Sequence, residues 1–362
     1  IIECWNIKMG KTNGMIISNT SAFFVIQNVT VSEPENTTQL PSPVAIYLYN
    51  VKNGIIKKSN LIGGMPFIPS NGIYIEKSSD IIIENNLIKS HNGVGITLNY
   101  TSNITIRENQ IYNNNRGIID TFSNRNVITN NRLYNNWRVI SSGSPVNLTI
   151  TENEIFNNSV GISLGAVLAS DYKTPILGYN NKIVNNSIFN NTYADVISFN
   201  GIINSTIANN KIFNNYVRAR VEDNLTTGAI ILICTYFYTT VCTAYNQIYK
   251  NRIFNNSQYG IYVRSLVPSG TGIVGNVIYS NDFINNSIAN KSRKQAYDEG
   301  NTNFWNSTSQ GNYWSDWTTP DNDTDGIVDV PYTLDGNGNV KDYYPLTSPV
   351  DTKYEIRNTK YE

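Results

Sequence analysis

The sequence has little charge, and the charge that it has is balanced. Of its 362 residues only 15% are charged, and 27 Lys and Arg residues face 27 Asp and Glu residues. Without a basic excess, binding to nucleic acid through phosphate neutralisation is not expected. Long apolar runs are also lacking, because stretches such as residues 228–234 fall far below the ~20 residues of a membrane helix. The chain therefore must fold as a soluble body with no membrane span in this segment.

Asparagine, isoleucine and 24 tyrosines are abundant instead, and they recur in register. The first four copies of an Asn-X-Ile or Asn-X-Leu unit lie about 22 or 23 residues apart, a period typical of solenoids. A second apolar residue stands three positions before each Asn, and a third stands nine to eleven positions after most of them. The aligned asparagines are Asn86, Asn109, Asn131, Asn153, Asn186, Asn210 and Asn251.

The spacing within each repeat predicts short β-strands. Apolar residues alternate with period two, as in Ile104 and Ile106, and they are β-branched, which favours strands over stacked helices. Three strands per repeat predict a parallel β-helix, in which each coil rises by ~4.8 Å and equivalent isoleucines stack inside. About ten coils fit between Gly14 and Asn286, a rod of ~50 Å. We expect the aligned asparagines to adopt left-handed backbone angles at corners and to form amide ladders.

The repeats divide the chain into three parts. Residues 1–300 are expected to form the all-β helix, with loop insertions near 163–182 and 216–247. Residues 301–346 are aromatic, Gly-rich and irregular, and predict a C-terminal cap, whereas 347–362 alternate like an edge strand. The first residues form an apolar strand that offers no cap for an open sheet edge. Because the chain starts without Met or a signal peptide, we expect either a removed leader or an excised portion.

Four motifs in the second half of the chain identify a resemblance. They are Asn303-Phe-Trp305-Asn-Ser-Thr, Gly311-Asn-Tyr-Trp-Ser-Asp316, the Asp-rich stretch from Asp321 to Tyr332, and Asp342-Tyr-Tyr-Pro-Leu346. Together with the coils, they resemble the NosD-like β-helix family, also described as carbohydrate-binding and sugar-hydrolase repeats. The resemblance implies a right-handed β-helix in an exported protein, often on a microbial surface.

The founding member of that family is linked to copper delivery, a role that this composition does not favour. Copper sites use clustered His, Met or Cys. This chain has only His91, three methionines and three cysteines, all scattered. No copper is expected, and His91 is interpreted as an ordinary corner residue.

An acidic segment follows the spacing of a calcium loop. Asp321, Asp323, Asp325 and Asp329 take positions one, three, five and nine, Gly326 takes position six, and Ile327 would offer its carbonyl oxygen at position seven. The bidentate acid of position twelve is missing, since Tyr332 stands there. A structural Ca²⁺ is predicted, and the alternative is a solvated cluster of Asx-turns.

Carboxylates on the coils are interpreted as structural. Glu108 and Glu152 share a row two coils apart, ~9.6 Å by strand spacing, which is the wide limit for an inverting glycosidase and excludes a retaining one. Glu84 and Arg107 are row neighbours suited to an ion pair.

The insertions contain clustered aromatic residues. Both insertions are expected at the same corner, so that their loops emerge side by side and form a platform for a glycan or a protein. The alternative is a small satellite core. The aromatic residues are Tyr172, Tyr179, Tyr236, Phe237, Tyr238 and Tyr245.

Glycosylation and disulfide signals point to the outside of the cell. Cys234 and Cys242 flank a short segment that could form a hairpin with a cross-strand disulfide; two buried thiols are the alternative. Acceptor sites of the Asn-X-Ser/Thr type exceed the number expected from composition. They include Asn19, Asn28, Asn99, Asn103, Asn147, Asn204, Asn224 and Asn306.

Two functions of different classes remain open. The preferred hypothesis is an extracellular, glycosylated scaffold or a self-assembling subunit of a surface filament, in which the tail strand of one copy adds to the open edge of the next. The alternative is a β-helix that binds polysaccharide or acts on it as a lyase or hydrolase, supported by the fold resemblance alone.

Overall fold

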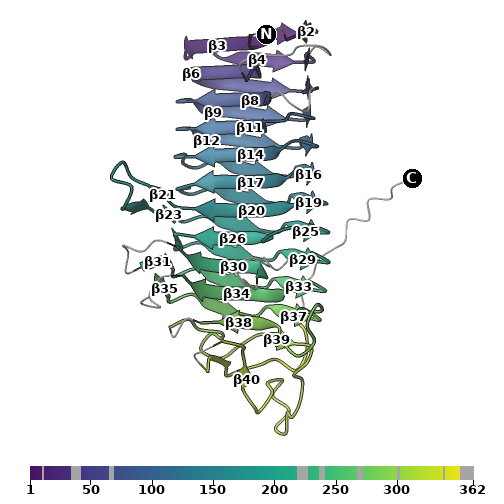
Figure 1. Cartoon of the computed structure of the whole chain (residues 1–362), viewed down its shortest axis with the longest axis vertical. Helices are drawn as coiled ribbons and strands as arrows, with labels where there is room; N and C mark the ends of the chain where they lie inside the picture. Colours follow the sequence, from purple (N-terminus) through teal and green to yellow (C-terminus); the bar gives the residue numbers. More distant parts are fainter. Residues whose placement is uncertain are drawn as a thin grey trace, which may run out of the picture.

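The chain winds into a parallel β-helix, as its repeat predicts. A computed structural model describes residues 1–9, 12–33, 42–64, 69–217, 227–235, 241–266, 272–299, 302–336 and 339–350. The described residues contain strands and no helix, so none of them forms an apolar helix long enough to cross a bilayer. Figure 1 shows the coils stacked along one axis, with the N-terminus at the top and the irregular residues after β38 at the bottom.

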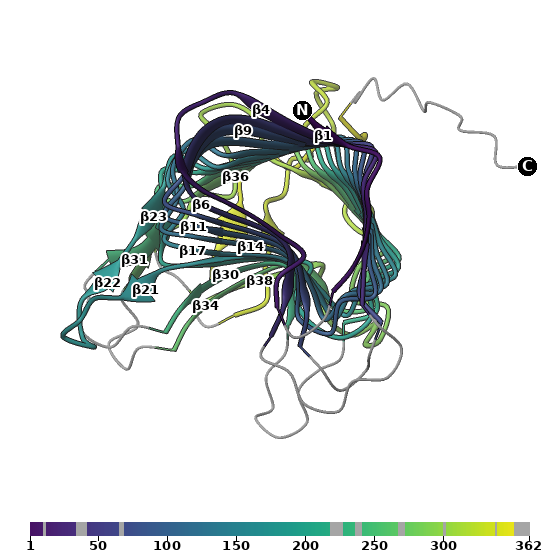
Figure 2. The ribbon, with the colours of Figure 1, turned by 90° about the horizontal axis from the view of Figure 1, so that it is seen from above.

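Each coil contributes one strand to each of three parallel sheets, which surround the core in Figure 2. Sheet A contains β1 (Ile2–Glu3), β4 (Phe24–Gln27), the second half of β6 (Val44–Lys57), β9 (Ser79–Glu84), β12 (Ser102–Arg107), β15 (Val127–Thr129), β18 (Thr149–Thr151), β24 (Lys182–Val184), β28 (Thr206–Ala208), β32 (Gln247–Tyr249) and β36 (Val277–Tyr279). Sheet B contains β2 (Asn6–Lys8), β5 (Thr30–Ser32), β7 (Asn60–Ile62), β10 (Leu87–Lys89), β13 (Gln110–Tyr112), β16 (Arg132–Tyr134), β19 (Glu154–Phe156), β25 (Ser187–Phe189), β29 (Lys211–Phe213), β33 (Arg252–Phe254), β37 (Asp282–Ile284) and β39 (Tyr313–Trp314). Sheet C contains β3 (Met15–Thr20), the first half of β6, β8 (Asn71–Glu76), β11 (Val94–Asn99), β14 (Arg116–Thr121), β17 (Arg138–Gly143), β20 (Val160–Gly165), β26 (Ile197–Asn200), β30 (Gly228–Cys234), β34 (Tyr259–Ser265) and β38 (Ala296–Asp298).

Equivalent isoleucines stack on one another inside the three sheets. Ile106 pairs in register with Ile128, and Ile128 pairs with Ile150, and all three side chains are fully buried. This confirms the predicted inward rows. In β30 the residue in register with Ile197 and Ile261 is Ile230, and its neighbour Ile231 faces outward.

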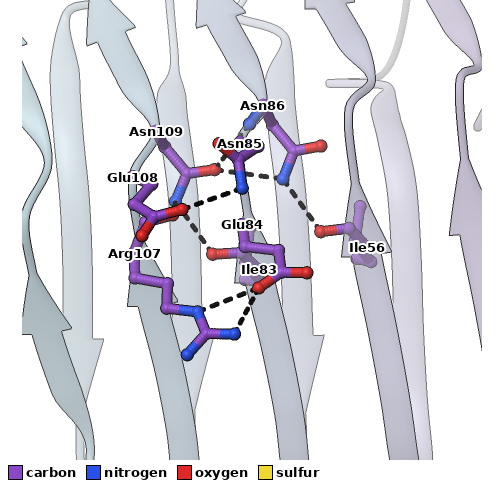
Figure 3. Close-up of polar contacts among 8 residues, drawn as sticks. All are labelled: Ile56, Ile83, Glu84, Asn85, Asn86, Arg107, Glu108 and Asn109. Atoms are coloured by element: carbon purple, nitrogen blue, oxygen red, sulfur yellow. Dashed lines mark hydrogen bonds and ion pairs between the residues drawn. The ribbon is translucent and has the colours of Figure 1, made fainter.

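Buried asparagines form a hydrogen-bonded ladder at the corner between sheets A and B. The Nδ2 atom of Asn86 donates to Oδ1 of Asn109 over 3.0 Å and to the carbonyl oxygen of Ile56, and Asn109 repeats this pattern toward Asn131 and Ile83. Figure 3 shows the first two rungs. The ladder satisfies backbone groups that the turn would otherwise leave unpaired in the core.

The left-handed backbone angles belong to a different residue from the one predicted. The residue before each ladder asparagine has positive φ, as in Glu108 (56°) and Asn130 (53°), whereas Asn109 and Asn131 do not. The exposed preceding residue makes the bend, and the buried asparagine supplies the hydrogen bonds. Two consecutive residues thus divide the roles that the sequence assigned to one.

A second ladder runs along the corner between sheets B and C, and His91 begins it. The backbone N–H of His91 donates to Oδ1 of Asn114, as an asparagine at that rung would. Its Nε2 lies 3.2 Å from the carbonyl oxygen of Leu61 and its Nδ1 lies 3.2 Å from the hydroxyl of Ser70. Complete burial lowers the pKa of the imidazole to about 4. His91 is therefore a neutral structural residue.

The insertions build an additional sheet at the corner between sheets C and A. Four short strands pair in parallel there, and an antiparallel hairpin projects beside them at the lower left of Figure 2. The repeat did not predict this sheet. Its strands are β23 (Gly178–Tyr179), β27 (Ile202–Ile203), β31 (Val241–Ala244) and β35 (Gly272–Val274), and the hairpin consists of β21 (Val167–Leu168) and β22 (Pro175–Ile176).

Cys234 and Cys242 lie in two neighbouring sheets and not in a hairpin. β30 pairs with β26 and β34, whereas β31 pairs with β27 and β35, all in parallel. Both cysteines are fully buried and surround Gly272, where an added Cβ would lie 2.9 Å from Sγ of Cys234 and 3.6 Å from Cβ of Cys242. The hairpin was wrong, and the disulfide stays a prediction.

The family motifs after residue 302 continue the ladders and supply buried tryptophans. Asn303 and Asn312 accept from Asn276 and Asn281, the last ladder residues of the coils. Two residues after each stands a buried tryptophan, Trp305 or Trp314. The ring of Trp314 stacks on Phe283 at 4.3 Å between centroids. The motifs thus cover the core below β37, and the division into β-helix, cap and tail stays a prediction.

Removing one ladder amide should destabilise the whole rod. In Asn131→Ala, Asn109 loses the acceptor of both its N–H and its Nδ2, and the carbonyl oxygens of Ile106 and Thr129 lose a donor. Since a buried group left unpaired costs about 1–3 kcal/mol, we expect the free energy of unfolding to fall by roughly 3–5 kcal/mol. Urea denaturation checks this, and the exposed Gln110→Ala should stay within about 0.5 kcal/mol of the parent. Equal losses in the two variants would contradict the role of the ladder.

Stability should fall as pH rises from about 4 to about 6. Burial raises the pKa of Asp120, inside sheet C, to about 6 and that of Asp342, beneath Trp314, to about 6. The unfolded carboxyls titrate near 3.9, so in this window both aspartates bind more protons in the native state, which loses stability as those protons leave. Asp282, whose pKa burial also raises to about 6, adds to the loss, and His91, with its pKa lowered to about 4, opposes it by one group. Asp120→Asn should flatten part of this slope and be more stable than the parent at neutral pH. Unfolding midpoints measured across the window check the sign, and a parent slope that rises with pH contradicts it.

Candidate functional site

The outer face of sheet C contains a hollow between two bulky ends. Along its central column Ile119 is followed by three small outward residues, the register partners Ser141, Ser163 and Ser198. Tyrosines occupy the same column at both ends, at Tyr74 on one side and Tyr262 on the other. The hollow measures about 260 Å³, and its lining includes Arg116, Ile119, Thr121, Arg138, Ser141, Gly143, Ser163 and Gly165. We call this hollow the trough.

The projecting hairpin forms one wall of the trough. Ser144 anchors it, because its hydroxyl donates to the carbonyl oxygen of Ile176 and accepts from the N–H of Val167. Val167 packs over Gly143, where an added Cβ would lie only 2.7 Å from the Val167 side chain. Glycine at 143 therefore allows the hairpin to approach the edge of the sheet.

The opposite wall is the corner between sheets B and C, and it carries an aromatic pair. Trp137 immediately precedes Arg138 and is 45% exposed, and Tyr193 is 43% exposed. Their ring centroids lie 4.9 Å apart at 47°, although they are separated by one intervening coil, in which Ser159 stands. The insertion of residues in the turn around Tyr193 lets its ring reach back to Trp137. Sequence analysis missed this pair, because Trp137 falls in a regular coil.

A second hollow of about 540 Å³ lies at the same corner, on the N-terminal side of Trp137. Amide side chains dominate its lining: Asn92, Asn113, Asn114, Asn115 and Asn135, with Gly64, Ser90 and His91. We call it the amide hollow. Asn115 directly precedes Arg116 of the trough, so the two hollows adjoin. The corner thus combines amides, hydroxyls and aromatic rings, the groups that recognise a sugar.

The predicted tyrosine platform falls only in part on the described residues. Tyr236, Phe237, Tyr238 and the acceptor Asn224 lie outside the described residues. Tyr172 is 82% exposed at the tip of the hairpin, Tyr179 lies in β23, and the ring of Tyr245 packs over Gly275. These three rings form no stacked pair with one another among the described residues. The first insertion and β31 of the second share the corner between sheets C and A, but the second insertion begins after β29, at the corner between sheets B and C. The three described tyrosines stand apart.

The row carboxylates take structural positions. Glu108 accepts from Asn85 over 2.9 Å and Glu152 accepts from Asn130 over 3.1 Å, at an exposed corner away from the trough. Arg107 donates to Glu84 over 2.9 Å, as the row predicted (Figure 3). Such exposed pairs contribute little stability. The described residues that line the trough include no acid.

Six outward rings on sheet B also form a ladder, and it is structural. Successive ring centroids lie 4.6–5.3 Å apart, and the ring planes are nearly parallel, with interplanar angles of at most 14°. Both faces of the four inner rings are covered by neighbouring rings, so a sugar cannot stack on them. The ladder consists of Tyr112, Tyr134, Phe156, Phe189, Phe213 and Phe254.

The acidic segment brings three of its predicted ligands together. Oxygens of Asp321, Asp323 and Asp325 lie within 4.8 Å of one another, and Oδ1 of Asp321 is buried without a hydrogen-bond partner. Gly326 has φ of +87°, which permits the turn. Asp329 instead accepts from the backbone and side chain of Asn322, and Ile327 donates its N–H to Asp325. The Ca²⁺ site stays a prediction, and the carboxylates of Asp321, Asp323 and Asp325 are the predicted ligands that the structure brings together.

Most predicted glycosylation acceptors occupy bends of the rod. Asn99 and Asn306 are half-buried, whereas the other described acceptors are exposed. The bends explain the Asn-X-Ser/Thr pattern: an exposed Asn with positive φ is followed by an inward residue and an outward Ser or Thr. Modification itself stays a prediction. The exposed acceptors are Asn19, Asn28, Asn103, Asn147 and Asn204.

The coils, ladders and family motifs define a parallel β-helix protein with a lined exterior trough. The family model described as "Periplasmic copper-binding protein (NosD)" matches residues 5–229 and 178–319. The chain belongs to the NosD family. No curated protein sequence matches it.

Solved structures share the fold at low sequence identity. The Azotobacter vinelandii mannuronan C-5 epimerase AlgE4 A-module is 15% identical with a TM-score of 0.54, over 85% of this chain and 84% of that chain. An alginate lyase from Paenibacillus sp. str. FPU-7 is 14% identical with a TM-score of 0.47, over 80% and 98%. The Dettilon tailspike protein is 16% identical with a TM-score of 0.49, over 75% and 61%. At these identities the likeness shows the fold alone.

The described residues do not suit copper, the metal in the description of the family. Both ring nitrogens of His91 have hydrogen-bond partners inside the rod. Met9 and Met15 are buried in the core, whereas Cys4 is exposed on the surface. Of the residues that the structure places, the one cluster of potential metal ligands is the set of three aspartates, and hard carboxylates suit Ca²⁺ or Mg²⁺ rather than copper.

Calcium should stabilise the protein through the three aspartates. Three carboxylates within 4.8 Å repel one another, and a divalent cation that binds only the native state raises Tm. We expect a higher Tm in millimolar CaCl₂ than in EDTA, and no such shift in the double variant Asp323→Asn/Asp325→Asn. Asp329→Asn should keep the shift, because Asp329 faces Asn322. The site is wrong if calcium leaves the Tm of the parent unchanged.

Proposed function

We propose that the protein is an exported, non-catalytic β-helix that binds a linear polysaccharide along the corner between sheets B and C. The observation that carries the proposal is the exposed Trp137–Tyr193 pair, because Trp137 stands in the chain between Asn135, which lines the amide hollow, and Arg138, which lines the trough. Aromatic faces bind the apolar C–H face of a sugar ring, while amides and hydroxyls bind its hydroxyl groups. Both hollows run beside the same corner, so a polymer parallel to the rod axis would touch both.

Export and a sugar ligand are also supported by the comparisons. The family description is periplasmic, and the AlgE4 module, with the same fold, is by its title a mannuronan epimerase. Catalysis is not part of the proposal, because the trough has no carboxylate pair among its described lining residues and glycosidases and their relatives require such groups.

The scaffold hypothesis is compatible with this function, since a rigid rod that binds polysaccharide can organise a surface layer. Its finer form, head-to-tail assembly through residues 347–362, concerns mainly residues outside the described part of the chain. It stays a prediction that sedimentation of the purified protein checks.

Removing the tryptophan ring should weaken polysaccharide binding. Trp137→Ala deletes the stacking face and leaves the backbone hydrogen bonds of the corner in place, so the fold should persist. Loss of one aromatic–sugar stack should lower affinity about tenfold or more. Affinity electrophoresis through gels that contain acidic or neutral polysaccharides measures this.

Two matched variants sharpen this test. Trp137→Phe should retain most of the affinity, because it keeps a ring. Tyr172→Ala, at the hairpin tip, should leave affinity unchanged. If Tyr172→Ala weakens binding and Trp137→Ala does not, the tyrosine loops are the platform and the proposed corner is wrong.

A further inference from the structure

Two arginines stand side by side on the trough, next to the aromatic pair. Arg116 and Arg138 are register partners in β14 and β17, so their backbones are one strand spacing apart, ~4.8 Å. Both are exposed, and Arg138 directly follows Trp137. In the same hollow, Thr121, Ser141 and Ser163 supply hydroxyl groups.

Neither guanidinium has a carboxylate partner within 4.0 Å among the described residues. Three other arginines of the rod are paired, Arg107 with Glu84, Arg132 with Glu154 and Arg264 with Glu299, whereas exposed Arg125 and Arg252 form no such ion pair among the described residues. Placing two like charges opposite each other on adjacent strands is unfavourable unless an anion lies between or above them. On a chain of net charge zero, this local excess is a feature of the trough and not of the whole surface.

In the described part of this column, the positive charge is confined to these two strands. In the same column Val94 precedes Arg116 and Val160 follows Arg138. One coil after Val160 stands Asp195, beside Val196 and in the next turn of the same corner. In the column of Thr121 and Gly143, beyond the central column, Glu76 is an acid, and it accepts a hydrogen bond from the hydroxyl of Tyr47. The anionic ligand must therefore present its charges over β14 and β17.

The geometry points to a linear polymer of uronic acids as the ligand, and this inference rests on the proposed function. The polymer would lie along the rod axis, with one sugar ring on Trp137 and neighbouring carboxylates on Arg116 and Arg138. Guanidinium groups bind carboxylates in a bidentate fork, which fixes both charge and orientation. The hydroxyls of Ser141 and Ser163 then face the polymer from the floor of the trough.

The experiment compares acidic polymers with a neutral one, and polygalacturonate and its carboxyl-reduced form are the pair that differs only in the charged group. Polygalacturonate and polymannuronate are used as acidic probes, and carboxyl-reduced polygalacturonate is used as the neutral counterpart. Binding of the full chain is measured by affinity electrophoresis and calorimetry at physiological salt. The variants are Arg116→Gln/Arg138→Gln, Arg116→Lys/Arg138→Lys, the single Arg138→Gln and, as the charge-matched control for that single variant, Arg125→Gln. Arg125 is exposed and precedes β15, at the corner between sheets C and A.

We expect the parent to bind at least one acidic polymer and to bind the reduced polymer at least tenfold more weakly. The Gln pair should lose about tenfold or more in affinity for the acidic polymer, and the Lys pair should recover part of it. The single Arg138→Gln should also lose affinity, whereas Arg125→Gln should match the parent. Circular dichroism and Tm verify that the variants fold.

Three results would overturn the inference, and they separate it from the proposed function. Equal binding of acidic and reduced polymers, unchanged in the Gln pair but lost in Trp137→Ala, leaves a neutral-glycan site and removes the arginine role. Equal losses in the single Arg138→Gln and in Arg125→Gln indicate attraction by overall charge without a site. Absence of binding to every polymer overturns the proposed function together with the inference.

Discussion

Parallel strand pairing at one fixed spacing is the constraint on which the rest of this structure depends. Each coil must place its residues directly over those of the preceding coil, so like side chains meet like side chains: isoleucine inside, asparagine at the corners and aromatic rings on sheet B. Since amide ladders are buried, an error of one residue would strand several polar groups in the core. The register is therefore fixed far more tightly than the apolar rows alone would fix it.

The same constraint makes the surface informative wherever it is broken. A row of repeated side chains is accounted for by its neighbours, as in the stacked rings of sheet B or the pair of Arg107 and Glu84. Trp137, Tyr193, Arg116 and Arg138 are not accounted for in that way. They interrupt the repeat within four consecutive coils at one corner, next to two hollows, which is why this corner and not the most aromatic face is assigned to a ligand.

Membership of the NosD family and the chemistry of this chain point in different directions. The family description names copper, yet the only described histidine ring is a neutral, buried member of an asparagine ladder. A repeat fold tolerates this divergence, because the core and corners hold the architecture while outward positions on each coil vary independently. Function then depends on a few outward side chains of three or four coils.

The sequence by itself determined the coil, its inward rows and the pairing of Glu84 with Arg107, because a short period repeated many times leaves one way to stack. It also located the acidic turn and the insertions. It assigned the left-handed backbone angle to the ladder asparagine instead of to the residue before it. Both residues are polar, and only their burial distinguishes them. The hairpin around Cys234, the corner sheet and the contact of Trp137 with Tyr193 were decided by tertiary structure alone. Trp137 and Tyr193 are 56 positions apart in the chain, and one coil separates them in the rod. No local sequence pattern indicates which outward rings turn toward each other.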